Sequence, residues 1–213
     1  MKAVRNLFCM LMLFVFNAAQ AKSTDLEDVL KIINKVNTYW QNHNKPESRA
    51  FWDNAAYHTG NMEAYFLTGN EDYLNYSETW AEHNQWMGAK GKDKSQWKYS
   101  YGETDEYVLF GDWQICFQTY IDLYNILPDN RRIKRTKEVM EYQMSTSRND
   151  YWWWSDGLYM VMPVMTKMYK LTGNERYLDK LYEYLTVADS IMFDPEKICI
   201  SVMPNMFIPS IRA

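Results

Sequence analysis

Apolar residues along most of this chain recur every three or four positions, which is the spacing of one buried face of a helix. No segment shows sustained alternation of the kind a half-buried strand needs, and turn-forming residues divide the pattern into separate runs. We therefore predict an all-α chain of about seven helices, with a long and potentially functional loop at 88–104. The expected helices begin after Asp25 and then cover roughly 52–67, 71–86, 106–126, 131–144, 155–171 and 175–192.

One motif occurs twice, at the ends of two of these helices. Residues 65–74 read YFLTGNEDYL and residues 169–178 read YKLTGNERYL, with a weaker copy at 124–133. The Gly of each copy ends one helix, and the Tyr-Leu pair after it packs the next helix back on the first. Three such hairpins predict a helical array, either an open solenoid or a closed toroid whose alternate helices line the inside.

Composition and charge limit the class of partner. The 213 residues are 47% apolar and 23% charged, with a net charge of −4 and acids and bases interspersed along the chain. Nucleic acid is therefore not expected as a partner. The aromatic content of 16% is high for a globular domain. An aromatic-rich core and a carbohydrate-binding cleft would each explain it.

The first 21 residues have the pattern of a secretory signal peptide. Lys2 and Arg5 precede an apolar run at 7–16, and Ala19-Gln20-Ala21 forms a cleavage site. We expect a periplasmic or secreted protein that is not held in the membrane after cleavage. Only Cys116 and Cys199 would remain, and the chain has three His, so neither a disulfide scaffold, a metal site nor a cofactor is expected.

Three consecutive tryptophans, Trp152, Trp153 and Trp154, stand directly before Ser155 and Asp156 at the start of a predicted helix. Consecutive helical residues point about 100° apart, so a core on one side cannot take all three rings. A pocket for a sugar-like ligand beside Asp156 would use them. Asp156 could equally be an N-terminal acid that the helix dipole favours.

A second acid, Asp112, lies among apolar residues next to Trp113. An unpaired carboxylate there would be costly to ionise, which suits proton transfer, although a hydrogen-bonded structural acid would fit as well. Two acids on separate hairpins are the minimum for glycosidic acid/base chemistry. His58 also lies in an apolar helix, where a structural role is the simpler interpretation.

Three blocks of this sequence resemble glycoside hydrolase families 88 and 105, the unsaturated glucuronyl and rhamnogalacturonyl hydrolases. They are 152–163 with the following 169–178, the stretch 111–124, and 52–60. The resemblance covers about 40–196 and implies an (α/α)6 barrel that removes a terminal 4,5-unsaturated uronic acid from lyase-generated oligosaccharides. In these families an Asp protonates the vinyl ether and activates the water that adds to it, after which the hydrated sugar opens and releases the oligosaccharide.

The resemblance assigns roles residue by residue. Asp156 matches the catalytic acid/base, and Asp112 matches the second active-site acid in a block that otherwise departs from the family's pattern. Trp154 matches an aromatic sugar contact. The remaining expected substrate contacts are Trp153, Trp113, Tyr57 and His58.

The chain is shorter than a complete six-hairpin barrel. We expect a signal peptide at 1–21, a partial glycosidase domain at 22–196 and an atypical tail at 197–213 that resembles a shifted reading frame. Such a chain would lack the family's carboxylate-binding His and Arg, which leaves its activity open. Its uncovered apolar helix faces would favour association. The alternative is a non-catalytic sugar-binding module or helical-repeat scaffold.

Overall fold

The computed structural model describes residues 26–195 and 199–202, and the described chain is mostly helical. The predicted signal peptide at 1–21 and most of the tail at 197–213 lie outside these residues. Within the described part, no helix is long and apolar enough to cross a membrane. A helix covers 26–43, and it is followed by α2 (Trp52–Thr68), α3 (Glu71–His83), η1 (Lys94–Gln96), α4 (Gly111–Gln114), α5 (Cys116–Ile126), α6 (Asn130–Ser145), α7 (Ser155–Thr172), α8 (Arg176–Met192), β1 (Phe193–Asp194) and β2 (Cys199–Ile200).

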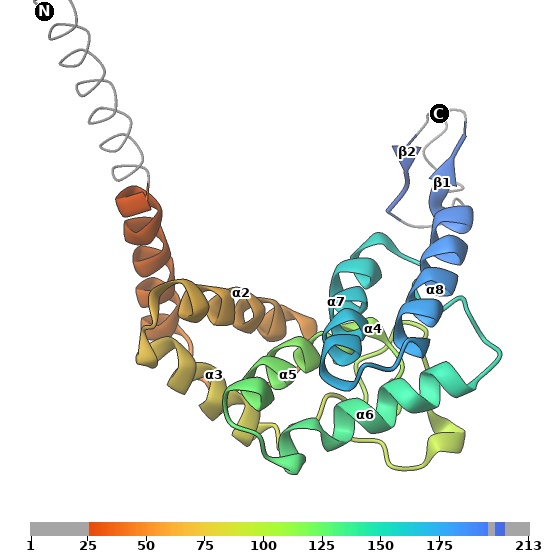
Figure 1. Cartoon of the computed structure of the whole chain (residues 1–213), viewed down its shortest axis with the longest axis horizontal. Coiled ribbons are helices and arrows are strands. Elements are labelled where there is room, and N and C mark those ends of the chain that lie inside the picture. The colour runs from red at the N-terminus through yellow and green to blue at the C-terminus, as the bar shows by residue number, and fades with distance from the viewer. Residues whose placement is uncertain (1–25, 196–198, 203–213) are drawn as a thin grey trace, which may run out of the picture.

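The long helices form antiparallel hairpins arranged in two layers. α2 pairs with α3, α5 with α6, and α7 with α8, while α2, α5 and α7 contact one another in sequence. Figure 1 shows α3, α6 and α8 around the outside of this row. Every residue from Cys116 to Leu123 in α5 is buried, as expected for a central helix with neighbours on all sides. The all-α hairpin architecture predicted from the sequence is confirmed.

The repeated motif works as the sequence predicted. Gly69 and Gly173 end α2 and α7 in the left-handed region, at φ 67° and 68°, and each donates its N–H to the carbonyl of the Tyr four residues earlier. Glycine adopts this conformation without a steric penalty. The Asn after each Gly then accepts a hydrogen bond from a backbone N–H two residues on, which satisfies a free donor in the first turn that follows.

Two helix boundaries differ from the expectation. The helix expected over 106–126 begins at Gly111, because residues 106–109 pair with the preceding loop: Lys98 N donates to the Glu106 carbonyl, and Leu109 N donates to the Lys98 carbonyl. The third helix ends at His83, and Gln85 and Trp86 adopt positive φ angles of 56° and 59°. The short pairing of β1 with β2 was not predicted.

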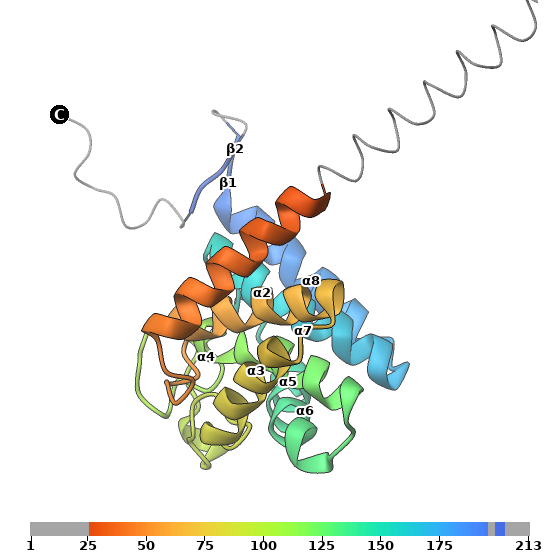
Figure 2. The ribbon, with the colours of Figure 1, turned by 90° about the vertical axis from the view of Figure 1, so that its left-hand side faces the viewer.

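The helix of residues 26–43 lies at the edge of the array, beside α2 and α3 (Figures 1 and 2). It exposes an apolar stripe of Leu26, Val29, Ile32 and Val36. A cavity of about 410 Å³ lies between this helix and α2. Uncovered apolar faces were expected, and association through them stays a prediction.

Gln118 in α5 compensates for Pro163 in the middle of α7. Because proline has no N–H, the carbonyl of Tyr159 loses its normal helical partner. The Gln118 side chain donates to that carbonyl at 3.0 Å and to the Met160 carbonyl at 2.9 Å. This contact ties two neighbouring inner helices together at a point where α7 could not satisfy its own backbone.

A double-mutant cycle tests this compensation. Replacing Gln118→Leu should lower the free energy of unfolding by about 1–3 kcal/mol, because it leaves a buried carbonyl unpaired. The same change should cost less in a Pro163→Ala background, where residue 163 donates its own N–H. Denaturant unfolding of the four proteins measures the coupling. Equal costs in both backgrounds would contradict the account.

Candidate active site

Three inner helices each carry an aspartate at their second residue: Asp53 in α2, Asp112 in α4 and Asp156 in α7. Free backbone N–H groups and the helix dipole favour negative charge at each of these positions. Asp112 experiences the charges of Asp156, Asp53 and Glu103, so the helix starts converge. We call Asp53, Glu103, Asp112 and Asp156 the acidic cluster.

Asp112 is the buried member of the cluster, with 6% of its surface exposed. Burial is the main cause that raises its pKa to about 7, and the negative charge of Asp156 is the second. Its Oδ1 is buried and has no hydrogen-bond partner among the described residues. Asp112 can therefore hold a proton close to neutral pH, whereas Asp156 is exposed and reachable by a ligand.

Arg49 holds the other two acids. Its guanidinium donates to Glu103 Oε2 at 2.7 Å and to Asp53 Oδ2 at 3.1 Å, which raises its own pKa. Glu103 also accepts a hydrogen bond from the exposed Tyr101 hydroxyl at 3.3 Å. The Arg49 guanidinium is thus paired with Asp53 and Glu103. Asp112 is left to avoid a buried negative charge by holding a proton.

Trp154 sets the spacing between the two expected catalytic acids. Its ring is buried against Phe110, with 4.9 Å between ring centroids. The same ring lies over Gly111, beside Asp112, and over Gly157, beside Asp156. A Cβ atom would come within 3.0 Å of the ring at Gly111 and within 3.3 Å at Gly157. Both acids are therefore attached to backbone that packs on one indole.

The three tryptophans precede α7 instead of lying within it, so the expectation from helical spacing does not apply to them, and their rings have different surroundings. Trp152 is buried against Tyr184 of α8, at 5.3 Å between ring centroids, so it anchors the outer helix. Trp153 is half-buried beside Trp154, at 4.8 Å. Trp113, next to Asp112, is buried, and its Nε1 donates to the Gly102 carbonyl at 3.3 Å. Of the expected aromatic contacts, only Trp153 keeps substantial exposure near the cluster.

Tyr57 and His58 lie in α2 one turn beyond Asp53, and both belong to a network that joins this helix to its neighbours. The Tyr57 hydroxyl donates to Asn37 Oδ1 at 2.7 Å, and its ring stacks on Trp40. His58 Nδ1 lies 3.0 Å from Ser77 Oγ, and its ring stacks on Trp80 at 4.0 Å. Burial lowers the pKa of His58 to about 3, so the imidazole is neutral at physiological pH. Their interactions in this structure hold α2 against its neighbours.

Several residues around the cluster were not predicted from the sequence. Asp53 and Glu103 surround Asp112, and Trp52 stands at the start of α2 with 47% of its surface exposed. The signal for Asp53 was its position, because it follows the predicted start of α2 as Asp156 follows the predicted start of α7. Across 26–195 and 199–202, no three His, Cys, Asp or Glu side chains are placed to hold a metal ion.

The family model of Glycosyl Hydrolase Family 88 matches residues 27–198. This chain belongs to glycosyl hydrolase family 88. A polysaccharide lyase of known structure is 64% identical, with a TM-score of 0.80, over 83% of this chain and 50% of that one. A family 88 glycosyl hydrolase from Bacteroides vulgatus is 62% identical, with a TM-score of 0.78, over 80% and 49%. The comparison with curated proteins gives no match.

The family 88 chain thus spans about half the length of these two solved structures. The expected resemblance to families 88 and 105 is confirmed as membership of family 88, although family 105 was expected to be the closer of the two, and the helical hairpins agree with that fold. The described residues hold both expected acids, on neighbouring inner helices.

The raised pKa of Asp112 makes a prediction about stability. Folding favours the protonated form, so its contribution is complete below the ordinary pKa of 3.8 and is lost as the pH rises through about 7. An Asp112→Asn variant keeps the shape of the neutral acid and should be the more stable protein above pH 7, by on the order of 2–4 kcal/mol. Urea unfolding at several pH values measures this. Parallel pH profiles for the two proteins would contradict it.

The packing of Trp154 makes a second prediction. Gly111→Ala should push the indole away and lower the free energy of unfolding by about 1–3 kcal/mol. Gly60→Ala is the matched control, because a Cβ there meets no heavy atom within 4 Å and the exchange favours the helix by about 0.5–1 kcal/mol. Thermal unfolding followed by tryptophan fluorescence compares them. A Gly111→Ala protein as stable as wild type would disprove the close packing.

Proposed function

We propose that this family 88 protein hydrolyses the bond to a terminal 4,5-unsaturated uronic acid, on oligosaccharides that polysaccharide lyases produce. Family membership supports a glycosidase. The observation that carries the finer assignment is the pairing of two acids with different surroundings: exposed Asp156 and buried Asp112, whose pKa is raised to about 7. A carboxyl whose pKa is raised by burial and by a second carboxylate, next to an acid that a ligand can reach, is typical of a catalytic site.

In the proposed reaction, Asp156 transfers the proton because it is the member of the pair that a substrate can reach. Its carboxyl gives a proton to C4 of the vinyl ether, and positive charge develops on C5 and the ring oxygen. A water adds its oxygen to C5 and returns a proton to the carboxylate, so one water is consumed and the acid is restored. The resulting hemiketal opens, and the oligosaccharide leaves with its hydroxyl group.

Asp112 acts on Asp156 through the electrostatic field in this proposal. A proton on Asp112 removes one negative charge from the acidic cluster, and its loss adds that charge back beside Asp156. Positive charge in the transition state gains from nearby carboxylates, of which Asp53 and Glu103 are close to Asp112. Trp153 and Trp52 would offer exposed ring surface for the sugar, and Trp154 fixes the spacing between the helix starts that carry Asp112 and Asp156.

The test follows the ultraviolet absorbance of the conjugated double bond in an unsaturated uronyl disaccharide. The wild-type chain should remove this absorbance, and Asp156→Asn should reduce the rate by at least about 100-fold, the lower range for loss of a general acid/base. Asp179→Asn is the matched control, because it makes the same exchange at an exposed acid of α8. Full activity in Asp156→Asn would disprove its role, and binding without turnover would favour a sugar-binding module.

A polysaccharide lyase reaction is the second candidate, because one solved structure with 64% identity is that of a polysaccharide lyase. A lyase abstracts the proton at C5 of a uronic acid and creates the double bond that a hydrolase of this kind removes. The same assay separates the two reactions. Absorbance that rises when the chain is mixed with an intact polyuronate would establish the lyase reaction, whereas a fall on the unsaturated disaccharide supports the hydrolase.

A further inference from the structure

A groove runs along the outer surface of α6, on the other layer of the array from the acidic cluster. It consists of two adjoining cavities of about 580 and 490 Å³, which share Lys134 and Glu138 as lining residues. The first also contacts the end of α3 and the turn at Gln85 and Trp86, and the second continues toward Ser145. We call this the α6 groove. Each cavity has the size of an ordinary ligand pocket.

The α6 groove concentrates positive charge in a protein whose net charge is −4. The cations that line it are Lys92, Lys94, Arg131, Lys134, Arg135 and Lys137, against the carboxylates Glu82, Glu138 and Glu141. Charges that look interspersed along the sequence come together here because the loop at 92–94 folds against one face of α6. Such a surface raises the local concentration of an anionic ligand.

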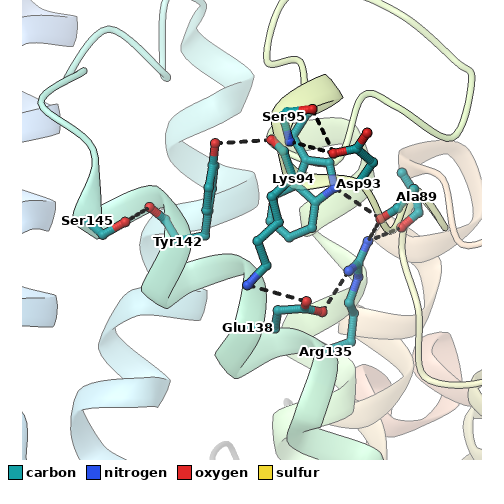
Figure 3. Close-up of polar contacts among 10 residues, drawn as sticks. Ala89, Asp93, Lys94, Ser95, Arg135, Glu138, Tyr142 and Ser145 are labelled. Atoms are coloured by element: carbon teal, nitrogen blue, oxygen red, sulfur yellow. Dashed lines mark hydrogen bonds and ion pairs between the residues drawn. The ribbon is translucent and has the colours of Figure 1, made fainter.

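Only some of these cations are engaged within the protein. Glu138 lies between Arg135 and Lys94, at 2.7 and 3.6 Å (Figure 3). Arg135 also donates to the carbonyls of Ala89 and Gly91, at 2.9 and 2.7 Å, and thereby fixes the loop that forms one wall. In the part of the chain that the structure describes, no carboxylate lies within ion-pair distance of Lys92, Lys134 or Lys137. These three lysines are available to a ligand.

The floor of the α6 groove is a built structure rather than a solvated helix face. Trp86 is 2% exposed. It lies in a turn where both it and Gln85 have left-handed backbone, a conformation that residues other than glycine rarely adopt. The guanidinium of Arg132 stacks over the Trp86 ring at 4.8 Å. Trp86 Nε1 and Arg135 Nε are buried N–H groups without an acceptor among the described residues. Backbone strain of the kind found in this turn is concentrated at functional sites.

The distribution of the free lysines indicates the class of ligand. Lys134 and Lys137 follow α6 and Lys92 faces them from the loop, so the charges are spread along a groove instead of converging on one phosphate-sized point. Trp86 is buried, so its ring face is closed to the base stacking that single-stranded nucleic acids need. An extended chain with one carboxylate on each sugar fits both observations.

We propose that the α6 groove binds a saturated polyuronate chain, as an accessory site separate from the acidic cluster. The choice of a uronate over another carboxylated glycan rests on the proposed function. The accessory site would hold the polymer that supplies substrate, while the acidic cluster acts on the unsaturated end. Lys92, Lys134 and Lys137 would contact the carboxylates of successive sugars.

Isothermal titration calorimetry at low ionic strength tests this with a tetragalacturonate and, as a neutral probe of the same stereochemistry, a galactose tetrasaccharide. We expect the wild-type chain to bind the uronate only. The double variant Lys92→Ala/Lys134→Ala should bind it roughly ten-fold more weakly, with an affinity that falls as salt rises. Lys170→Ala, an exposed lysine of α7 outside the groove, should bind like wild type. Glu82→Gln should bind more tightly, because it removes a lining carboxylate.

Turnover of the unsaturated disaccharide by the double variant keeps the two proposals distinct. Unchanged turnover with weakened tetragalacturonate binding supports the accessory site. Equal binding by the double variant and wild type, or no binding by wild type, would overturn the accessory site whatever the turnover. A single-stranded DNA of equal charge that binds as tightly, and is weakened equally by the double variant, would show a general polyanion surface and also overturn it. If the wild-type chain binds tetragalacturonate in the α6 groove but does not turn over the disaccharide, only the proposed reaction is disproved.

Discussion

The packing of Trp154 between two glycines is the contact on which the candidate active site depends. Gly111 lies beside Asp112 at the start of α4, and Gly157 lies beside Asp156 at the start of α7. With any larger residue at either glycine, the indole and the helix start could not keep their present distance. The two acids therefore belong to one packed unit, although 44 positions separate them in the sequence.

The same unit explains why the two acids differ. Asp112 enters the interior with its helix, where burial and the charge of Asp156 raise its pKa to about 7, while Asp156 stays at the surface. Gln118 then joins α5 to α7 at the Tyr159 carbonyl, which Pro163 leaves without its helical partner. This is a further contact between the inner helices, beyond the helix starts that Trp154 holds. Arg49 holds Glu103 and Asp53 around the pair. The four acids of the cluster thus gather where α2, α4 and α7 begin and where the loop at Glu103 approaches them.

Much of the fold could be predicted from local chemistry. The repeated Gly-Asn pair determines where α2 and α7 end, since glycine is free to adopt left-handed backbone and the following Asn accepts a hydrogen bond from the backbone where the next helix begins. The start of α4 could not be predicted, because residues 106–109 bond to a loop distant from any helix pattern. Asp156 and Asp112 were recognised from their aromatic neighbours. Asp53 and Glu103 were missed because their approach to Asp112 is a tertiary contact, and the α6 groove was missed because its lysines come from two separate segments.

Asp112 and Asp156 thus form one electrostatically coupled pair in this family 88 protein. The most direct measurement is a titration of the Asp112 carboxyl carbon by nuclear magnetic resonance in the wild-type chain and in Asp156→Asn. The account predicts an apparent pKa of about 7 in wild type and a lower value in the variant, where the second negative charge is gone. A wild-type pKa near the ordinary 3.8, or one that does not change in Asp156→Asn, would contradict it.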